Sequence, residues 1–295
     1  MNRPRIRSGW VAALTATLAL AAVVAAPGCQ TSPATGRAHV NLLNEAEEIR
    51  LGNEFAPEFL EQGGGPIPSE RVQEYVSDLG HRLAAVSERP DLPWTFYTLD
   101  SAIINAFALP GGKVFISRGL LVEMDNEAQL AAVLGHEIGH VTDQHIGRQM
   151  SRGVLAQGAL AVFGASVSDA EWAAVIGLGA ETAAGLTLLR FSREQENTAD
   201  ALGIRYMTQL DYNPVGALQV MEILHRASGA RGGVELFQTH PYPETRIERI
   251  ERIIREDFPD YDDPARYRFH ADRFKENVLD ELDDLPAPTH DPRSQ

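Results

Sequence analysis

The sequence predicts an α+β fold that is mainly helical and contains one small mixed β-sheet. In several long segments, apolar residues recur at spacings of three and four, which is the period of an amphipathic helix. Three short segments, 94–99, 105–109 and 113–117, have the composition or alternation of strands, and a Pro-Gly-Gly turn separates the last two. Hydrophobic residues make up 44% and charged residues 23% of the chain, which is typical of a folded globular protein.

The first two helices are expected before the strands. Asn44 and Glu47 have the spacing of a capping box at the start of a helix over 44–60. The run Gly63-Gly64-Gly65-Pro66 predicts a flexible break, after which Ser69 begins a second helix.

A third helix, beginning at Asn126, contains the most informative motif of the chain, His136-Glu137-Ile138-Gly139-His140. Gln129 stands in the capping-box position, and apolar residues continue the helical period at Leu130, Val133, Leu134, Ile138 and Val141. Residues four apart share one face of a helix, so His136 and His140 can direct two imidazoles at one ion. Glu137 points to the same side and can reach a metal-bound water, which is the pattern of a zinc hydrolase.

Two glycines interrupt this helix. Gly135 and Gly139 should each cost a helix interior roughly 1 kcal/mol relative to alanine. Either a neighbouring element packs closely against them, or they mark an irregularity needed for function.

A catalytic zinc site usually has three protein ligands, so a third must come from elsewhere in the chain. The residues after His140 do not continue as Gly-x-x-His, which excludes the metzincin pattern. Further on, Glu196 and Asp200 share a face of another predicted helix. Glu196 is then the candidate ligand, and Asp200 would accept a hydrogen bond from the distal N–H of a ligand histidine. Glu194 is a rival ligand, and a solvated acidic face is the alternative without a metal.

These motifs together resemble the HtpX-like gluzincin metallopeptidases related to the CAAX prenyl proteases, especially their bacterial periplasmic and lipoprotein members. The resemblance covers roughly residues 40–255. It is carried by Asn105 to Gly112, Asn126-Glu127, His136 to His140, Ser192-Arg193 with Glu196, Ala199-Asp200, and Thr239-His240-Pro241 with Arg246.

The resemblance implies a zincin-like fold and a role for each matched residue. It implies that His136, His140 and Glu196 bind one Zn²⁺ per chain and that Glu137 is the general base. It gives Asp200 a supporting role, sometimes described as that of a proton donor, and places His240 over the open zinc position. A donor to the oxyanion is also required, and His240 or Arg246 is a candidate. Alternatively, His240 only starts a helix, because prolines and an apolar stripe follow it.

Segment 105–109 is expected to be an edge strand that binds substrate. Its apolar alternation and the following turn suit pairing with an extended peptide through backbone hydrogen bonds. Ordinary core burial is the alternative for Phe107 and Leu109. Of the remaining histidines, His145 lies five residues after His140 and points partly away from the ligand face, so we expect a surface or capping role for it.

The N-terminus predicts export. Arg3, Arg5 and Arg7 precede an apolar stretch from Trp10 to Ala26, which is the layout of a signal peptide over residues 1–28. Cys29, the only cysteine, resembles the lipidated cysteine of a bacterial lipobox, although Ala26 replaces the usual leucine and Pro27 is unusual. We expect a periplasmic protein anchored by Cys29 to the outer membrane, with Gln30 favouring that membrane. Ordinary secretion is the alternative.

The predicted organisation has four parts: the signal peptide, a tether over 29–43, a zinc metallopeptidase domain over 44–260, and an acidic tail with several prolines over 261–295. Segment 154–189 predicts two helices, either buried or facing a membrane, and the charges at Asp169, Glu171 and Glu181 leave its apolar runs too short to span. Another helix is expected near 272–285.

Charge and motifs restrict the function. Removing residues 1–28 takes away three arginines and no acid, so the net charge goes from −15 to −18, which argues against a nucleic-acid partner. We expect a zinc endopeptidase acting on unfolded or misassembled envelope proteins. The alternative is a zinc-containing chaperone or assembly factor with an occluded site. The absence of a second-metal carboxylate cluster disfavours a small-molecule metallohydrolase. The sequence does not indicate an oligomeric state.

Overall fold

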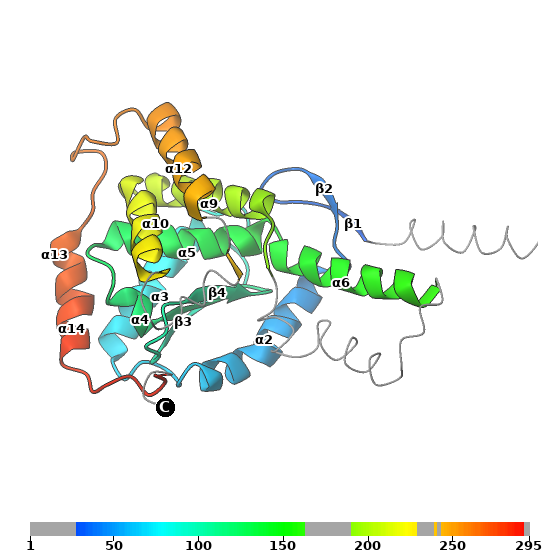
Figure 1. Ribbon diagram of the computed structural model, residues 1–295, viewed down its shortest axis with the longest axis horizontal. Helices are drawn as coiled ribbons and strands as arrows, with labels where there is room; N and C mark the ends of the chain where they lie inside the picture. Colours follow the sequence, from blue (N-terminus) through cyan, green and yellow to red (C-terminus); the bar gives the residue numbers. More distant parts are fainter. Residues whose placement is uncertain (1–27, 163–189, 229–238, 241–242, 292–295) are drawn as a thin grey trace, which may run out of the picture.

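The computed structural model describes residues 28–162, 190–228, 239–240 and 243–291 of the 295-residue chain. The expected α+β class with mainly helical content is confirmed: helices surround a small mixed sheet, and helix α5 (Glu127–Thr142) runs through the middle of the molecule (Figure 1). Helix α9 (Arg193–Gln209) lies along α5, and the sheet lies on another side of it.

The helices begin close to the predicted positions. Helix α2 (Glu45–Gln62) has the reciprocal capping box of Asn44 and Glu47, and α3 (Glu70–Ala85) is capped by Ser69. At the start of α5, Asn126 accepts from the Gln129 N–H at 3.1 Å. The Gln129 side chain accepts from the Asp125 N–H, one residue before the cap, so the predicted capping box is not reciprocal.

Three strands form the mixed sheet: β3 (Thr95–Leu99), β4 (Ala106–Leu109) and β5 (Lys113–Ser117). Strand β5 is central, parallel to β3 and antiparallel to β4, with Phe107 opposite Phe115. The edge position expected for 105–109 is therefore confirmed. Gly111 and Gly112 in the turn before β5 have φ angles of 72° and 91°, a conformation that glycine adopts without steric cost.

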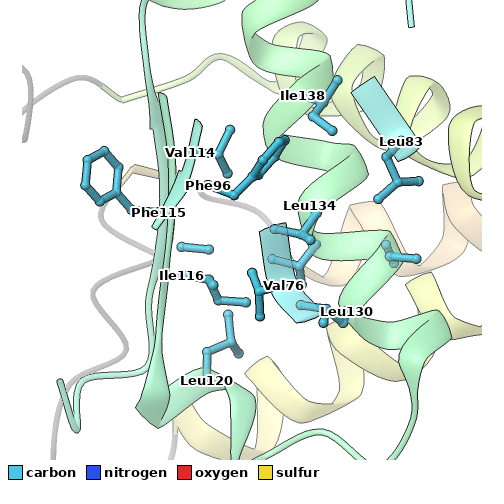
Figure 2. Close-up of a cluster of buried hydrophobic side chains, with 14 of the residues drawn as sticks. Val76, Leu83, Phe96, Val114, Phe115, Ile116, Leu120, Leu130, Leu134 and Ile138 are labelled. Carbon is cyan, nitrogen blue, oxygen red and sulfur yellow. The ribbon is translucent and has the colours of Figure 1, made fainter. Parts of the chain in front are cut away.

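The core lies between this sheet and the central helices. Val114 and Ile116 of β5 point toward Leu130, Leu134 and Ile138 of α5, whereas Phe115 points to the opposite side of the sheet (Figure 2). There its ring stacks on Phe107 at a centroid distance of 4.8 Å, and Phe59 of α2 packs beside them. Both faces of the sheet are covered, and the alternation of β5 divides its side chains between them.

Helices α5 and α9 approach each other closely at their glycines. A Cβ atom on Gly135 would lie 3.0 Å from the Gly203 carbonyl oxygen, and one on Gly139 would lie 3.1 Å from the Ala199 Cα. Close packing of a neighbouring element, one of the two alternatives for these glycines, is therefore what the structure has. The short distance brings residues of α9 next to the histidines of α5.

Residues 29–43, expected as a tether, are folded against the domain. Strands β1 (Cys29–Thr31) and β2 (Ala38–Val40) pair antiparallel, and we call residues 29–40 the N-terminal hairpin. Next to it, the Leu42 N–H donates to the Ser151 hydroxyl of helix α6 (His145–Val162) at 2.7 Å. The tether prediction overlooked these contacts because they join residues more than a hundred positions apart.

The C-terminal region also differs from the expected tail. Helices α10 (Val215–Ser228) and α12 (Pro243–Asp257) precede a helical segment made of α13 (Ala271–Phe274), the π-helical turn η1 (Lys275–Leu279) and α14 (Asp280–Asp283). In that segment Phe274, Val278 and Leu282 are buried in the core. Residues 271–285 therefore belong to the folded domain, in the place where the sequence predicted a helix. The remaining short helix, α4 (Arg118–Leu121), follows β5.

The helices predicted over 154–189 are described only in part. Residues 154–162 form the second half of α6, and residues 163–189 lie outside the described residues. Within the described part of the chain, no helix is both long enough and apolar enough to cross a bilayer.

The contact between α5 and α9 predicts a substitution effect. In Gly203→Ala the new Cβ would lie 2.8 Å from the His136 backbone nitrogen, so the helices must separate. We expect the free energy of unfolding, measured by chemical denaturation, to fall by about 1–3 kcal/mol.

The matched control is Gly153→Ala in α6, where an added Cβ meets no atom within 4 Å. Its unfolding free energy should rise by about 0.5–1 kcal/mol, because alanine favours a helix over glycine. Equal stability of Gly203→Ala and the wild type would contradict the close packing.

Candidate metal centre

The two histidines of the motif share one side of α5 and face the same point. The Nε2 atoms of His136 and His140 lie 3.0 Å apart. From α9, Glu196 Oε1 lies 3.5 Å from His140 Nε2, and Glu196 Oε2 lies 3.6 Å from His136 Nε2. His140 and Glu196 are completely buried, and His136 nearly so.

His240 adds a fourth donor to this group. Its Nδ1 lies 3.3 Å from His136 Nε2 and 3.0 Å from Glu196 Oε1. We refer to His136, His140, Glu196 and His240 as the donor cluster, whose ligand atoms all lie within 4.8 Å of one another. Although burial lowers the pKa of His240, the charges of Glu196 and Glu137 outweigh this effect and raise it above its ordinary value.

The donor cluster has the chemistry of a zinc site, and several of its donor distances are close to those of tetrahedral coordination. Zinc binds imidazole nitrogen and carboxylate oxygen at 2.0–2.2 Å, which places neighbouring ligand atoms about 3.3 Å apart. The distances between donors printed above, 3.0–3.6 Å, bracket this value. The buried Glu196 Oε2 has an ion-pair contact with Arg246 Nη1 at 2.7 Å but no aligned hydrogen bond, so it can also bind a metal.

Of the two rival acids, only Glu196 lies in the cluster. Glu194 is exposed on the first turn of α9, where its carboxylate pairs with Arg37 at 2.7 Å. The N-cap Ser192 and its capping box with Gln195 set the start of the helix, and thereby the direction in which each acid points.

Asp200 and Arg246 contact the cluster from the side of His136 Nδ1, opposite the Nε2 that faces the other donors. Asp200 Oδ1 lies 2.9 Å from His136 Nδ1, which is the contact that the sequence led us to expect. The Arg246 guanidinium donates to both Asp200 oxygens, at 2.9 and 2.6 Å, and its Nη1 lies 2.7 Å from Glu196 Oε2. Burial raises the pKa of Asp200, but Arg246 and then His136 outweigh this effect and hold it well below its ordinary value.

Arg246 therefore does not suit the oxyanion role for which the sequence made it a candidate. Its guanidinium is buried and engaged with two carboxylates, so it orients Asp200 and Glu196. His240, itself a member of the donor cluster, is the remaining candidate. The alternative was that His240 only starts a helix. Instead, its side chain lies among the donors, and helix α12 begins three residues later, at Pro243.

The environment of His145 was not anticipated. This residue is buried, its Nδ1 lies 3.0 Å from His140 Nδ1, and its Nε2 lies 2.8 Å from Asp143 Oδ2. Gln144, between α5 and α6, has a positive φ of 55°, which turns the chain and brings His145 back against His140. A helical period does not predict such a turn, so the expected surface role was wrong.

A cleft of about 300 Å³ opens beside the donor cluster. Its walls include Phe59 of α2, Asn105, Phe107 and Leu109 at the edge strand, and Phe191 and His240 near the cluster. The Phe191 ring packs 3.9 Å from the His140 ring, between centroids. Glu137 lines a second cavity, together with Val220 and Met221 of α10, and His240 borders both spaces. An extended chain in the cleft would run along β4 toward the histidines.

Comparison with known proteins agrees with this site. Residues 70–254, more than half of the chain, match the model of peptidase family M48, so the chain belongs to that family. This is a zincin-like metallopeptidase family that uses zinc, which makes zinc the metal that the donor cluster fits.

Among its relatives is the beta-barrel assembly-enhancing protease of Escherichia coli, 29% identical over 255 residues that cover 82% of this chain and 51% of the relative. Another is the mitochondrial metalloendopeptidase OMA1 of Schizosaccharomyces pombe, 32% identical over 229 residues, 76% of this chain and 66% of the relative. The OMA1 of Bos taurus is 28% identical over 246 residues, which cover 76% of this chain and 46% of that relative. The chain thus spans about half the length of the E. coli relative.

The donor cluster predicts which acid is needed for zinc. Glu196→Ala removes one of the donors, so we expect zinc content, measured by elemental analysis after dialysis, to fall well below one ion per chain. His136→Ala and His140→Ala should behave alike. The matched control is Glu194→Ala, which changes an exposed acid two residues away and should keep the wild-type zinc content. A wild-type zinc content in Glu196→Ala would show that another residue is the third ligand.

Proposed function

We propose that this protein is a zinc-dependent endopeptidase, with His136, His140 and Glu196 as metal ligands and Glu137 as general base. The observation that carries the proposal is the position of the Glu137 carboxylate: it is buried, lines the second cavity, and lies 3.8 Å from Nε2 of His240, the donor-cluster residue that also borders the cleft along β4. A purely structural zinc site needs neither a general base nor a cleft.

In the proposed mechanism the protein supplies proton transfer and orientation. Zinc, when bound, polarises the scissile carbonyl and lowers the pKa of water to about 7. Glu137 accepts the proton of the attacking water and then delivers it to the leaving amine. Asp200 holds His136 in one orientation, and Arg246 holds Asp200 and Glu196. His240, whose Nε2 lies 3.8 Å from Glu137 Oε1, is the candidate donor to the oxyanion.

Substrate is proposed to bind as an additional strand on β4. The Ser117 N–H donates to the Asn105 carbonyl, so in an antiparallel ladder Phe107 and Leu109 also form hydrogen-bonded pairs with β5. The backbone groups of Ala106 and Ala108 then point to the edge of β4 that has no neighbouring strand among the described residues. A peptide bound there is recognised mainly by its backbone, which favours unfolded or extended segments over a particular sequence.

We infer that the substrates are unfolded or misassembled envelope proteins. The support is the predicted signal peptide, the finer resemblance to the periplasmic HtpX-like members, and the E. coli relative, whose name describes a protease that enhances beta-barrel assembly. The proposed location is the periplasm, with a lipid on Cys29 anchoring the protein to the outer membrane. Cys29 is exposed at the start of the N-terminal hairpin, where a lipid can reach it.

The alternative is a zinc-containing assembly factor whose site is occluded. One observation favours it: His240 Nδ1 stands at the fourth position of the donor set, which a peptidase must leave open. As a peptidase, the protein must move this ring before substrate binds.

Cleavage of an unfolded protein tests the proposal. The purified mature chain with zinc should cleave casein, and Glu137→Gln should lower the rate by about 10²–10⁴-fold, because the general base is lost. Gel electrophoresis over a time course measures this.

Zinc content of Glu137→Gln is the control, and it should equal that of the wild type, since Glu137 is not a ligand. Chelation should also abolish cleavage. A zinc-loaded wild type that leaves casein intact would favour the occluded assembly factor.

The edge strand predicts a second effect. Ala108→Pro removes an N–H that points to the free edge and leaves the ladder to β5 intact, so the fold should persist. We expect casein cleavage to fall at least tenfold at unchanged zinc content. Ala108→Val, which keeps the N–H, should retain most of the activity. Equal activity of both variants would show that β4 does not bind the substrate backbone.

A further inference from the structure

His140 has a hydrogen-bond partner on the side that faces away from the donor cluster. Its Nε2 faces His136 and Glu196, whereas its Nδ1 lies 3.0 Å from His145 Nδ1. If His140 binds zinc through Nε2, its proton must be on Nδ1, which then donates to His145. His145 Nδ1 is therefore the acceptor, and the proton of this second ring is on Nε2.

The other nitrogen of His145 lies at ion-pair distance from a carboxylate. His145 Nε2 lies 2.8 Å from Asp143 Oδ2, so the order is Asp143, His145, His140 and then the metal. Each member is almost completely buried, and none of the three exceeds 2% exposure. Water therefore does not replace these contacts.

Asp143 is itself held by residues distant in sequence. The Thr35 hydroxyl donates to Asp143 Oδ1 at 2.9 Å, and the Ser32 hydroxyl donates to the same oxygen. Ser32 is buried, and both residues belong to the turn of the N-terminal hairpin. Arg148 of α6 pairs with the other oxygen, so the carboxylate has both a counter-charge and hydroxyl donors.

The two ligand histidines of α5 thus have comparable support. His136 contacts the carboxylate of Asp200, which Arg246 holds. His140 contacts a carboxylate that Arg148 holds, with the ring of His145 inserted between them. Partners of this kind fix the tautomer and orientation of a metal ligand and commonly change metal affinity by about 10- to 100-fold.

We propose that His145 and Asp143 are positioning residues for the ligand His140, and that Ser32 and Thr35 make the N-terminal hairpin part of the metal centre. This inference rests on the proposed zinc site. It adds that zinc affinity depends on a hairpin that begins at Cys29. A disturbance of the hairpin then reaches the metal through Asp143, His145 and His140 in turn.

Zinc affinity and cobalt spectra test the proposal without any measurement of cleavage. His145→Phe keeps an aromatic ring beside Phe191 but removes both nitrogens, and should raise the zinc dissociation constant, measured by chelator competition, about 10- to 100-fold. It should also change the visible spectrum of the cobalt-substituted protein. His145→Asn, whose oxygen can accept near the former Nδ1 position, should recover part of the affinity. The matched control is His81→Phe, which alters an exposed histidine of α3. It should change neither the zinc dissociation constant nor the cobalt spectrum.

A second pair of variants addresses the hairpin and protects the test against a His145 variant that fails to fold. The double substitution Ser32→Ala with Thr35→Val should raise the zinc dissociation constant several-fold, whereas Ser77→Ala on α3 should not. In the zinc-loaded wild type, ¹⁵N NMR should find the proton of His140 on Nδ1 and that of His145 on Nε2.

Wild-type zinc affinity in both folded His145→Phe and the hairpin double variant would overturn the inference, and so would the opposite tautomers. If the protein fails to cleave casein but its zinc affinity, cobalt spectrum and tautomers are as expected, the proposed peptidase activity is contradicted and this inference is not. A wild-type chain that binds no zinc would overturn both.

Discussion

The close approach of α5 and α9 is the constraint on which the site depends. Because Gly135, Gly139 and Gly203 have no side chains, the backbones of the two helices come nearly into contact at these positions. This separation brings the Glu196 carboxylate of α9 within 3.6 Å of both imidazoles of α5. The glycines lower the helical propensity of α5, and the lost stability is offset by burial of its whole length in the core.

Charge compensation in the buried centre follows from this packing. Glu137, Glu196, Asp200 and Asp143 are all buried, and a buried carboxylate without a partner is strongly unfavourable. Arg246 lies between Glu196 and Asp200, and Arg148 lies beside Asp143. A metal dication would supply the remaining positive charge. The histidines of the centre therefore lie in an electrostatic setting that favours a bound cation over an empty site.

Local spacing predicted most of the fold and the inner part of the site. The period of α5 places His136 and His140 on one face, and the four-residue spacing of Glu196 and Asp200 reaches the same point from α9. What the sequence did not predict depends on chain turns and long-range packing. The positive φ of Gln144 brings His145 inward, the engagement of Arg246 excludes its oxyanion role, and the hairpin contacts replace a tether. None of these has a periodic signature.

The metal centre is assembled from segments that the ribosome produces far apart in time. His136 and Arg246 are 110 positions apart, and Arg273 of α13 pairs with Glu127, at the first turn of α5, across 146 positions. Such non-local contacts form late in folding, because closing long loops carries an entropic cost. A nascent or partly folded chain therefore lacks the complete centre. The proposed hydrolytic activity would appear only with the finished tertiary structure, which spares the chain's own unfolded intermediates during synthesis.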